Sequence, residues 1–536
     1  MGGDTVVSVP GIDIPRMGLP DRLTATLSMG EQHDLLRVRR RTLLGGALAT
    51  AVAYGSPAWA ARLPGKHVIP FGRHLAWGAS PRTQMRVGWQ VPHVVTKPFL
   101  RLGDTPWSLG GRIDAEIRPL HSEVTGAIAP VDQYYLHAAL DGLRPGTTYY
   151  YAVGHDDFDP ADLTSFGRID SFTTAPSRHH VAGRFTFTAF GDQGVSSHAL
   201  RNGGTIAAQG PAFHLHAGDL CYADSSGKGR PVSADGAHGT DLYDPRRWDQ
   251  FWAQNEAVAA SVPWMACLGN HDMEALYSPD GYGGQLARWD FPANGPDRGV
   301  GVYSFIYGNV GVVALDANDI TFETTPNRGY TGGAQTRWLD GRLKYLREQE
   351  DVDFVVVFFH HCAYSTTSSH ASEGGVRNLW VPLFDKYGVD LVINGHNHVY
   401  ERADTMKGGV ARKTPIGDTV HPATDGTTYI TAGGGGRGLY AFSAPDTYAG
   451  HEQPESEVAS FVWAAGGAQV EEKVTWSRVR YTGYSFLAVD ADPAHRGHTA
   501  TLTLRALTEN GTEIDRLVIA RTAGGGHRHH LDDDIS

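Results

Sequence analysis

With 536 residues the chain is too long for a single hydrophobic core, and its length predicts roughly two to four domains. Hydrophobic residues make up 41% and charged residues 19%, with 66 glycines and 29 prolines; this composition indicates a globular protein rich in turns and strands, and excludes a disordered or collagen-like chain. The formal net charge of -12 argues against a nucleic acid as the main partner, while leaving room for a small anion at a locally positive site.

Residues 37–60 carry the pattern of an export signal. A basic stretch that contains Arg40 and Arg41 is followed by a short apolar segment and by Ala58-Trp59-Ala60, a small-x-small cleavage site. The apolar segment is too short and too rich in glycine and alanine to anchor the protein in a bilayer. The arginine pair with Leu43-Leu44 just beyond it resembles the twin-arginine signal, a bacterial export route for folded proteins.

These features predict that residues 1–60 form a signal segment outside the fold. The stretch before Arg37 is long for the start of such a signal, which makes Met17 and Met29 alternative start positions. We expect export by the twin-arginine route, to the outside, the cell surface or the periplasmic side of a bacterium, and no stable membrane anchor.

The chain has three cysteines, which are Cys221, Cys267 and Cys362. Their odd number and wide spacing provide no disulfide framework, so the stability of the fold must come from its hydrophobic cores. We expect three buried thiols, although the sequence leaves a single disulfide open.

Residues 61–177 are predicted to form an all-β sandwich. Alternating apolar and polar residues, as in Met85–Trp89 and Tyr134–Leu140, recur between turns rich in glycine. The stretch Leu143–Val153 is similar to the turn and strand near the end of fibronectin type III-like domains. Such domains are usually structural or adhesive, so we assign no catalysis to this part.

Residues 178–522 change to apolar strands separated by long loops and helices, which predicts an α/β layered domain. One helix is expected after Asp244-Pro245, with Trp248, Phe251 and Trp252 on its buried face, and another is expected around Trp338–Leu346. Residues 484–521 look like closing strands, with Asn510-Gly511 as a hairpin turn. Residues 523–536 are expected to be a disordered tail.

Apolar strands in this domain end at polar residues. Phe185–Phe190 leads to Asp192, Phe213–Ala217 to Asp219 and Tyr222, Val262–Leu268 to Asn270, Phe354–Phe359 to His360, and Val389–Asn394 to His396 and His398. Ligands of α/β sheets bind at the carboxyl ends of the strands, so we expect these side chains to meet there.

The same residues offer enough ligand atoms for two metal ions. Asp219 is the natural bridging carboxylate, and His396 and His398 can present two imidazoles on one side of an extended chain. Taken alone, Asp219 and Tyr222 are better explained by helix capping and core packing, and the two histidines by a surface pair. The joint presence of all seven at strand ends favours a metal centre.

Five blocks of sequence, read in order, resemble the metal-binding blocks of the purple acid phosphatases, within the metallophosphoesterase superfamily. They are Asp192-x-Gly194, Gly218-Asp219-x-x-Tyr222, Gly269-Asn270-His271-Asp272, Val357-x-x-His360 and Gly395-His396-x-His398. The resemblance covers the whole chain after the signal, including the β-sandwich of the plant-type members. It implies a catalytic domain with an α/β four-layer β-sandwich fold.

The resemblance also implies the roles of the ligands. Asp192, Tyr222 and His398 would hold Fe(III), Asn270, His360 and His396 would hold a divalent ion (Zn, Mn or Fe), and Asp219 would bridge the two ions. Generic metallophosphoesterases carry Asp-x-His in the first block, whereas this chain has Gly194 there and Tyr222 in the second block, and a phenolate favours a trivalent ion. The implied activity is that of an acid phosphatase, which hydrolyses small phosphate monoesters by attack of a metal-bound hydroxide.

Three more residues are candidates for catalysis. His271, next to Asn270, is placed to protonate the leaving group. His370 and Glu373 match the substrate-side histidine and acid of the family, although the paired histidines of the family read Ser369-His370 here. Asp224 could orient a ligand, and for both Asp224 and Glu373 the role of an ordinary loop carboxylate stays open.

Two other functions also stay open. The same metals would serve a phosphodiesterase or nucleotide hydrolase, and a cell-surface binding protein could retain the site as a vestige. The sequence makes no prediction about the oligomeric state.

Overall fold

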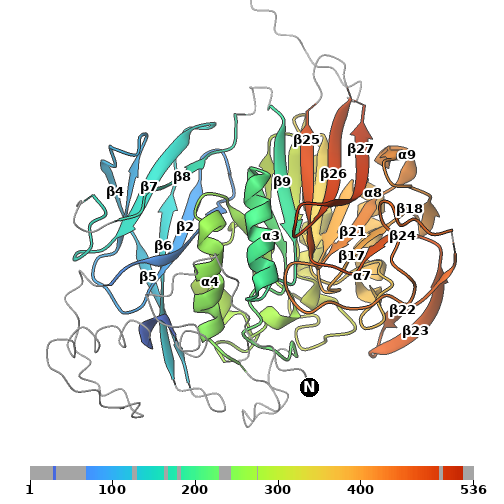
Figure 1. Cartoon of the computed structure of the whole chain (residues 1–536), viewed down its shortest axis with the longest axis horizontal. Helices are drawn as coiled ribbons and strands as arrows, with labels where there is room; N and C mark the ends of the chain where they lie inside the picture. Colours follow the sequence, from blue (N-terminus) through green and yellow to red (C-terminus); the bar gives the residue numbers. More distant parts are fainter. Residues whose placement is uncertain are drawn as a thin grey trace, which may run out of the picture.

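The computed structural model of the chain describes residues 28–31, 68–123, 130–161, 167–177, 183–228, 243–274, 276–454, 456–493 and 499–522. A β-sandwich lies beside a larger part built from two sheets and their helices (Figure 1). The expected export signal at 37–60, the boundary between the two parts around 178–182 and the tail at 523–536 lie outside the described residues.

The β-sandwich pairs two four-stranded sheets, with strand orders β1-β2-β6-β5 and β4-β3-β7-β8. Its strands are β1 (Phe71–Trp77), β2 (Met85–Val91), β3 (Phe99–Gly103), β4 (Gly111–Asp114), β5 (Glu116–Ser122), β6 (Val131–Leu140), β7 (Thr148–Gly154) and β8 (Asp170–Thr173). Alternate residues of β7, Tyr149, Tyr151 and Val153, enter the core with Trp77 and Trp89. The predicted sandwich is therefore confirmed.

The larger part contains two seven-stranded sheets. The first has the order β11-β10-β9-β25-β26-β27-β20 and the second the order β12-β13-β14-β16-β21-β17-β24. The first comprises β9 (Phe185–Phe190), β10 (Phe213–Ala217), β11 (Trp264–Cys267), β20 (Thr419–Val420), β25 (Ser485–Asp492), β26 (Ala500–Thr508) and β27 (Glu513–Arg521). The second comprises β12 (Tyr303–Tyr307), β13 (Val310–Ala314), β14 (Phe354–Phe359), β16 (Leu391–Asn394), β17 (Tyr400–Ala403), β21 (Thr428–Ala432) and β24 (Ser477–Tyr481).

Helices cover the outer face of each sheet. They are α3 (Ser197–Ala208) and α4 (Arg246–Ala259) on the first sheet, and α6 (Ala334–Arg347), α7 (Gly374–Leu379) and α8 (Val381–Tyr387) on the second. Along β14, Val356 and Phe358 face the other sheet, whereas Val355 and Val357 face the helices. This alternation produces the four layers helix, sheet, sheet and helix, and confirms the predicted fold of the catalytic part.

Shorter elements connect these layers. They are η2 (Asn270–Asp272), α5 (Gly283–Arg288), η3 (Ala317–Asp319), α9 (Pro422–Asp425), the hairpin β18 (Thr405–Lys407) with β19 (Val410–Arg412), and a small sheet of β15 (Ser372–Glu373), β22 (Val458–Ala464) and β23 (Ala468–Val474). The predicted closing strands are β25 to β27, and Asn510-Gly511 lies in the turn between the last two.

Helix α4 joins the two parts of the molecule (Figure 1). Its Trp252 ring stacks on the ring of His74 from β1, with the centroids 3.6 Å apart and the planes at 15°. The hydroxyl of Tyr151, on β7, donates to the backbone oxygen of Ala260 just after the helix, at 2.7 Å. The buried aromatic face predicted for this helix therefore forms the contact with the sandwich.

Residues 28–31, which the sequence pattern assigns to a segment outside the fold, contact the same seam. The side chain of Met29 is buried against Phe71 and Ala253, and its backbone N–H donates to Asp249 at 3.0 Å. The prediction that all of residues 1–60 lie apart from the fold is therefore wrong for this turn, because an apolar Met fills a gap between β1 and α4.

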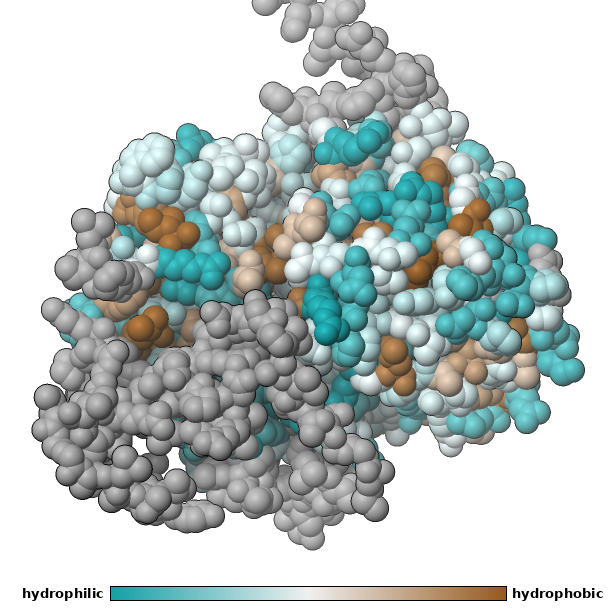
Figure 2. Space-filling model, in the orientation of Figure 1, coloured by the Kyte–Doolittle hydropathy of each residue, from teal (hydrophilic) through white to brown (hydrophobic). Residues whose placement is uncertain are grey.

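The face of the molecule drawn in Figure 2 shows apolar residues in small separate patches among polar ones. Exposed large apolar side chains include Trp107, which is 84% exposed, and Val410, which is 71% exposed. Within the described residues, no helix combines the length and the apolar character needed to cross a membrane. The three cysteines are free and buried, as predicted.

Candidate metal centre

The register of the parallel strands places five loops next to one another. Ala217 at the end of β10 pairs with Cys267 of β11, and Phe359 at the end of β14 pairs with Asn394 of β16. The two sheets meet closely at this edge, since a Cβ on Gly395 would lie 2.6 Å from the oxygen of Ala217. The loops that follow these strands and β9 carry all seven predicted ligands.

The first set of donor atoms surrounds the hydroxyl of Tyr222. This hydroxyl lies 3.1 Å from Oδ1 of Asp192 and 2.8 Å from Nε2 of His398, and that nitrogen lies 3.3 Å from the Asp192 oxygen. The other ring nitrogen of His398, Nδ1, donates to the backbone oxygen of Gly438 at 2.6 Å. Nε2 of His398 is therefore left with its lone pair free for a metal.

The second set surrounds Nε2 of His360. This nitrogen lies 3.1 Å from Oδ1 of Asn270, 3.2 Å from Nδ1 of His396 and 3.2 Å from Oδ1 of Asp219. Nδ1 of His360 donates to the backbone oxygen of Ala217 at 2.8 Å, which again directs the lone pair of Nε2 into the set.

Asp219 belongs to both sets. Donor atoms of Asp192, Asp219 and His398 all lie within 4.8 Å of one another, while Oδ1 of Asp219 also faces His360. Burial alone would raise the pKa of Asp219, but His360 and His271 outweigh burial and hold this pKa well below its usual value. The position between the two sets is the one predicted for a bridging carboxylate.

Asp272 holds the loop that carries Asp219. Its carboxylate accepts three backbone N–H groups, from Gly269 at 2.8 Å, Asp219 at 2.9 Å and Leu220 at 3.1 Å. Burial and the nearby charge of Asp219 raise the pKa of Asp272 to about 8, although these hydrogen bonds oppose the shift. The last residue of the Gly-Asn-His-Asp block thus fixes the backbone beneath the site.

Four of the seven predicted ligands adopt the left-handed backbone conformation. The φ angles are 61° for Asp192, 53° for Asp219, 57° for Tyr222 and 68° for His396. This conformation costs a residue other than glycine roughly 1–2 kcal/mol. Such a concentration of strain is typical of a site where function determines the direction of side chains.

The residues present fit a pair of metal ions. Oδ2 of Asp192 is buried and has no hydrogen-bond partner, although a buried carboxylate oxygen normally has one. Burial, together with the charges of Asp192 and Asp219, raises the pKa of Tyr222 well above its usual value. A strongly charged cation would supply the missing partner and stabilise the phenolate.

His271 lies at the rim of the centre. Its Nε2 is 3.9 Å from Oδ2 of Asp219, and its ring lies 4.3 Å from the ring of Tyr222. Its Nδ1 donates to the backbone oxygen of Asp224 at 2.7 Å, so Nε2 is the nitrogen that faces the site. Asp224 thus acts through its backbone, while its carboxylate accepts from Ser226.

The structure does not bring Glu373 into the site, and its predicted role as a catalytic acid needs correction. The carboxylate accepts from the hydroxyl of Thr321 at 2.8 Å and from the backbone N–H groups of Phe322 and Gly375 at 2.8 and 2.9 Å. Glu373 is the N-cap of α7, and it holds the loop at 321–323. Sequence spacing relative to His360 could not reveal the direction of this side chain.

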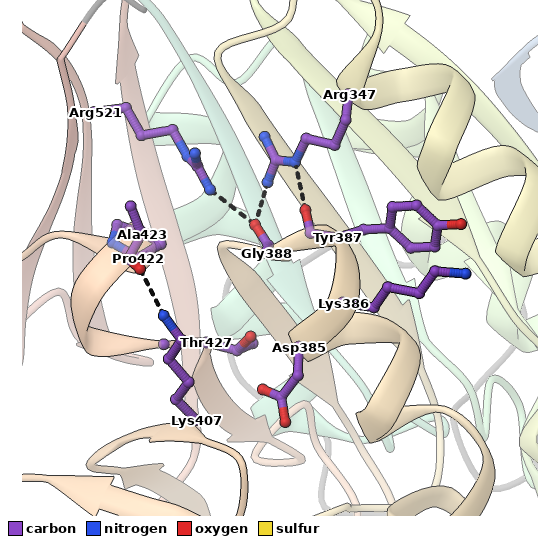
Figure 3. Close-up of a pocket in the computed structure, with 11 residues that line it drawn as sticks. Arg347, Asp385, Lys386, Tyr387, Gly388, Lys407, Pro422, Ala423, Thr427 and Arg521 are labelled. Atoms are coloured by element: carbon purple, nitrogen blue, oxygen red, sulfur yellow. Dashed lines mark hydrogen bonds between the residues drawn. The ribbon is translucent and has the colours of Figure 1, made fainter.

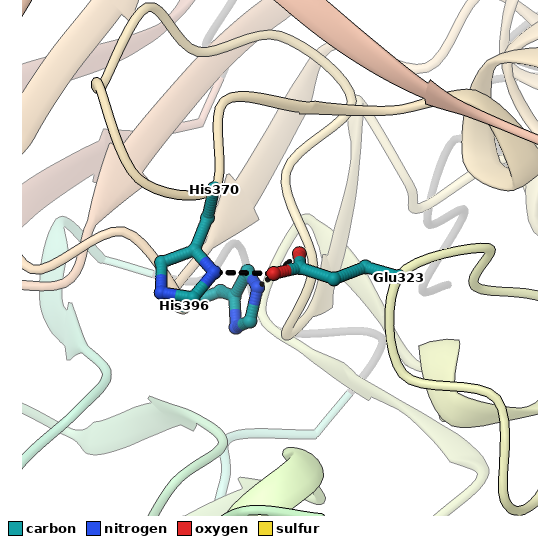
Figure 4. A group of neighbouring side chains, drawn as sticks. All are labelled: Glu323, His370 and His396. Atoms are coloured by element: carbon teal, nitrogen blue, oxygen red, sulfur yellow. Dashed lines mark hydrogen bonds and ion pairs between the residues drawn. The ribbon is translucent and has the colours of Figure 1, made fainter. Parts of the chain in front are cut away.

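Glu323, in that loop, is a site residue that the sequence pattern did not reveal. Its carboxylate contacts both His370, at 2.5 Å, and His396, at 2.8 Å (Figure 4). The three residues come from separate loops, and their ligand atoms lie within 4.8 Å of one another. Glu323 lies in an irregular stretch without a motif, so no sequence signal pointed to it.

Two residues of the segment after the Gly433–Gly436 loop also border the centre. The ring of Tyr440 stacks on His398 at 4.0 Å, and the guanidinium of Arg437 lies over the ring of Tyr222 at 4.7 Å. The backbone N–H of Arg437 donates to the backbone oxygen of Asp192 at 2.9 Å. The segment that follows this glycine loop therefore brings a cation to the edge of the site.

A cavity of about 290 Å³ lies elsewhere, near the start of β16 (Figure 3). Arg347 and Arg521 point to the backbone oxygen of Gly388 there and both pair with Asp390. Gly388 and Asp390 precede β16, whereas His396 and His398 follow it, so this cavity is separate from the metal centre.

Comparisons with known proteins agree with this geometry. Residues 70–174 match the family model for the N-terminal domain of purple acid phosphatases, and residues 187–400 match the model for calcineurin-like phosphoesterases. The chain is 32% identical to an uncharacterised protein of Mycobacterium tuberculosis over 527 residues, which cover 90% of this chain and 93% of that protein.

Plant proteins are similar as well. Purple acid phosphatase 23 of Arabidopsis thaliana is 30% identical over 309 residues, which cover 56% of this chain and 62% of that protein. The structure of the purple acid phosphatase PPD1 from yellow lupin superposes with a TM-score of 0.62 at 21% identity, covering 85% of this chain and 75% of that chain, and so shares the fold. The chain therefore belongs to the purple acid phosphatase family of binuclear metallophosphoesterases.

Proposed function

We propose that the protein is an exported acid phosphatase that hydrolyses small phosphate monoesters, with Fe(III) and a divalent ion such as Zn, Mn or Fe as its metals. The observation that carries this proposal is the convergence of seven donor residues into two sets that share Asp219. Tyr222 in the first set favours a trivalent ion there, because a phenolate adds negative charge.

In this assignment Asp192, Tyr222 and His398 hold Fe(III), whereas Asn270, His360 and His396 hold the divalent ion. When bound, the two ions supply the positive charge that attracts a phosphate dianion and the Lewis acidity that activates water. Neutral imidazoles are needed for this binding: burial lowers the pKa of His396 to about 4, whereas Asp219 outweighs burial and raises the pKa of His360 to about 9, so the metal must displace a proton from His360.

Residues at the rim would bind the substrate and protonate its leaving group. His271 keeps one proton on Nδ1 for the oxygen of Asp224, so a second proton on Nε2 can pass to the leaving oxygen. Arg437 adds a positive charge beside Tyr222, where a phosphate group can approach. The net charge of -12 also favours a small ester over a nucleic acid as partner.

Export by the twin-arginine route is part of the proposal. It is supported by Arg40 and Arg41, the apolar stretch behind them and the small residues Ala58 and Ala60.

The experiment compares an aryl phosphate monoester with a bis-aryl phosphate diester as substrates of the metal-loaded protein. We expect faster turnover of the monoester at acidic pH, and a loss of about 100-fold or more in Asp219→Asn, since a shared metal ligand contributes several kcal/mol. Asp340→Asn, which removes a surface carboxylate paired with Lys386, serves as the matched control. Dominant turnover of the diester would show a phosphodiesterase instead, and turnover that survives in Asp219→Asn would refute the centre.

A further inference from the structure

Glu323 differs from the other partners of the ligand histidines. His360 and His398 each donate from Nδ1 to a backbone oxygen, of Ala217 and Gly438. His396 instead turns Nδ1 toward the second donor set and Nε2 toward the carboxylate of Glu323. A backbone oxygen is present whichever residue occupies the position, so the partners of His360 and His398 do not depend on a particular side chain. The orientation of His396, in contrast, depends on the side chain of Glu323.

The contact with Glu323 determines the tautomer of His396. An ionised carboxylate can only accept a hydrogen bond, so Nε2 of His396 must carry the proton at this 2.8 Å contact. Nδ1 then keeps its lone pair, and it faces Nε2 of His360 at 3.2 Å within the second set. Carboxylates that accept from a ligand histidine in this way fix its ring and strengthen the metal bond.

The second oxygen of the same carboxylate holds His370. Nδ1 of His370 donates to Oε1 of Glu323 at 2.5 Å, while Oε2 faces His396. The side chain of Glu323 is 13% exposed and that of His370 is 26% exposed. One carboxylate thus contacts both histidines, with a separate oxygen for each.

The backbone beneath Glu323 is itself fixed. Glu373 accepts from the hydroxyl of Thr321 and from the backbone N–H groups of Phe322 and Glu323. The indole N–H of Trp463 donates to the backbone oxygen of His370 at 2.8 Å. Both sides of the pair between Glu323 and His370 are therefore anchored to ordered backbone.

We propose that Glu323 is a positioning residue that fixes the tautomer of His396 for the second metal and turns His370 toward the substrate. This inference rests on the proposed function, since it assigns His396 to a metal. With Nδ1 bound to Glu323, the Nε2 atom of His370 points away from Glu323 and is the ring nitrogen left for a substrate (Figure 4).

The test is Glu323→Gln, which keeps the shape of the side chain but removes its charge. Metal-free protein is loaded with iron and titrated with Zn²⁺. We expect the affinity for the second metal to fall about 10- to 100-fold, the range found when such partners are removed. The visible band of the tyrosinate bound to Fe(III) should stay unchanged, because Glu323 contacts none of Asp192, Tyr222 and His398.

A double-mutant cycle tests the second half of the proposal. At saturating Zn²⁺, His370→Ala should lower kcat in the wild-type background and have a smaller effect in the Glu323→Gln background, because His370 is no longer held. Glu513→Gln, which removes a carboxylate from a surface pair with Arg516, is the matched control and should leave both readouts unchanged.

Three results would decide against Glu323 as a positioning residue. They are a second-metal affinity within about twofold of the wild type, equal effects of His370→Ala in both backgrounds, and a third bound metal that disappears in Glu323→Gln. The last result would show that Glu323, His370 and His396 form a metal site of their own. A wild-type protein that binds two metals without hydrolysing monoesters would refute the proposed function. The Zn²⁺ titration would still test the role of Glu323 in that case, because it measures metal affinity and not hydrolysis.

Discussion

In the proposed centre, Tyr222 is the donor that favours Fe(III) in the first set. Its ring is buried, and its hydroxyl contacts both Asp192 and His398. Of the seven donors it is the one whose ionised form is a phenolate, which gives a visible charge-transfer band with Fe(III).

Tyr222→Phe is therefore expected to abolish the purple band and to weaken iron binding at least about tenfold, because it removes one anionic donor and keeps the ring. Visible spectra and iron analysis of the purified variant measure both effects. Tyr440→Phe, whose ring stacks on His398, is the matched control and should keep the band. A band that persists in Tyr222→Phe would mean that another group binds the iron.

The residue scale also shows what the sequence could reveal. All seven donors followed apolar strands in short blocks, so their convergence could be predicted from strand ends and the resemblance to a family. Glu373 shared the spacing of a catalytic acid, but its side chain caps α7, and spacing along a chain does not determine direction. Glu323 could not be found, because its role depends on a loop that another part of the chain, Glu373, holds in place.

At the scale of elements, the stack of His74 on Trp252 makes the seam between the sandwich and α4 sensitive to acid. Burial lowers the pKa of His74 to about 3, with a further decrease from His137, against opposing effects from Gly72 and Asp290. The unfolded chain binds a proton at pKa 6.5, so between pH 6.5 and 3 the unfolded state holds more protons. The stability contributed by this neutral ring is complete above pH 6.5 and is lost as the pH falls.

The expected loss is about 2 to 3 kcal/mol at a pH of about 4.5. His74→Phe keeps an aromatic ring against Trp252 and removes the titration, so its free energy of unfolding should fall less than that of the wild type as the medium is acidified. Urea unfolding measured at several pH values gives the comparison, and His121→Phe, at an exposed histidine, is the control. Parallel pH profiles of His74→Phe and the wild type would contradict the role of His74.

Elements with a strong pattern were predicted well from the sequence. The aromatic face of α4 and the alternating strands of the sandwich follow directly from periodicity. The order of the strands within the two sheets did not follow, since β25 returns from near the other end of the chain to pair with β9, and β26 and β27 follow it in the same sheet. Local pattern carries no information about such distant pairing.

At the scale of the whole molecule, the metals are expected to stabilise the fold as well as to support catalysis. Asp192 and Asp219 bring two carboxylates into a buried place beside the phenol of Tyr222, and Oδ2 of Asp192 has no partner there. An ion that binds only the folded state adds stability by mass action, about 3 kcal/mol at 100 times its dissociation constant.

Removal of the metals by a chelator should therefore lower Tm by about 5 °C or more. A reducing agent should leave the Tm of the metal-free protein unchanged, because Cys221, Cys267 and Cys362 are free thiols and there is no disulfide among them to break. Differential scanning calorimetry measures the Tm of the metal-loaded and the metal-free protein. In Asp219→Asn the chelator should lower Tm by less than in the wild type. A Tm that does not respond to the chelator would show that the metals add nothing to stability.

The position of the ligands along the chain has a consequence for biosynthesis. Asp192 follows β9, but its partner His398 follows β16, and most of the catalytic part of the chain lies between them. A growing chain on the ribosome thus cannot complete either donor set until strands of both sheets, from β9 to β16, have been synthesised and have met. Metal loading is then a late event, and the compartment in which the chain folds also decides which metals it receives. For the twin-arginine export that we propose, this compartment is the cytoplasm, so the protein would leave the cell with its metals already chosen.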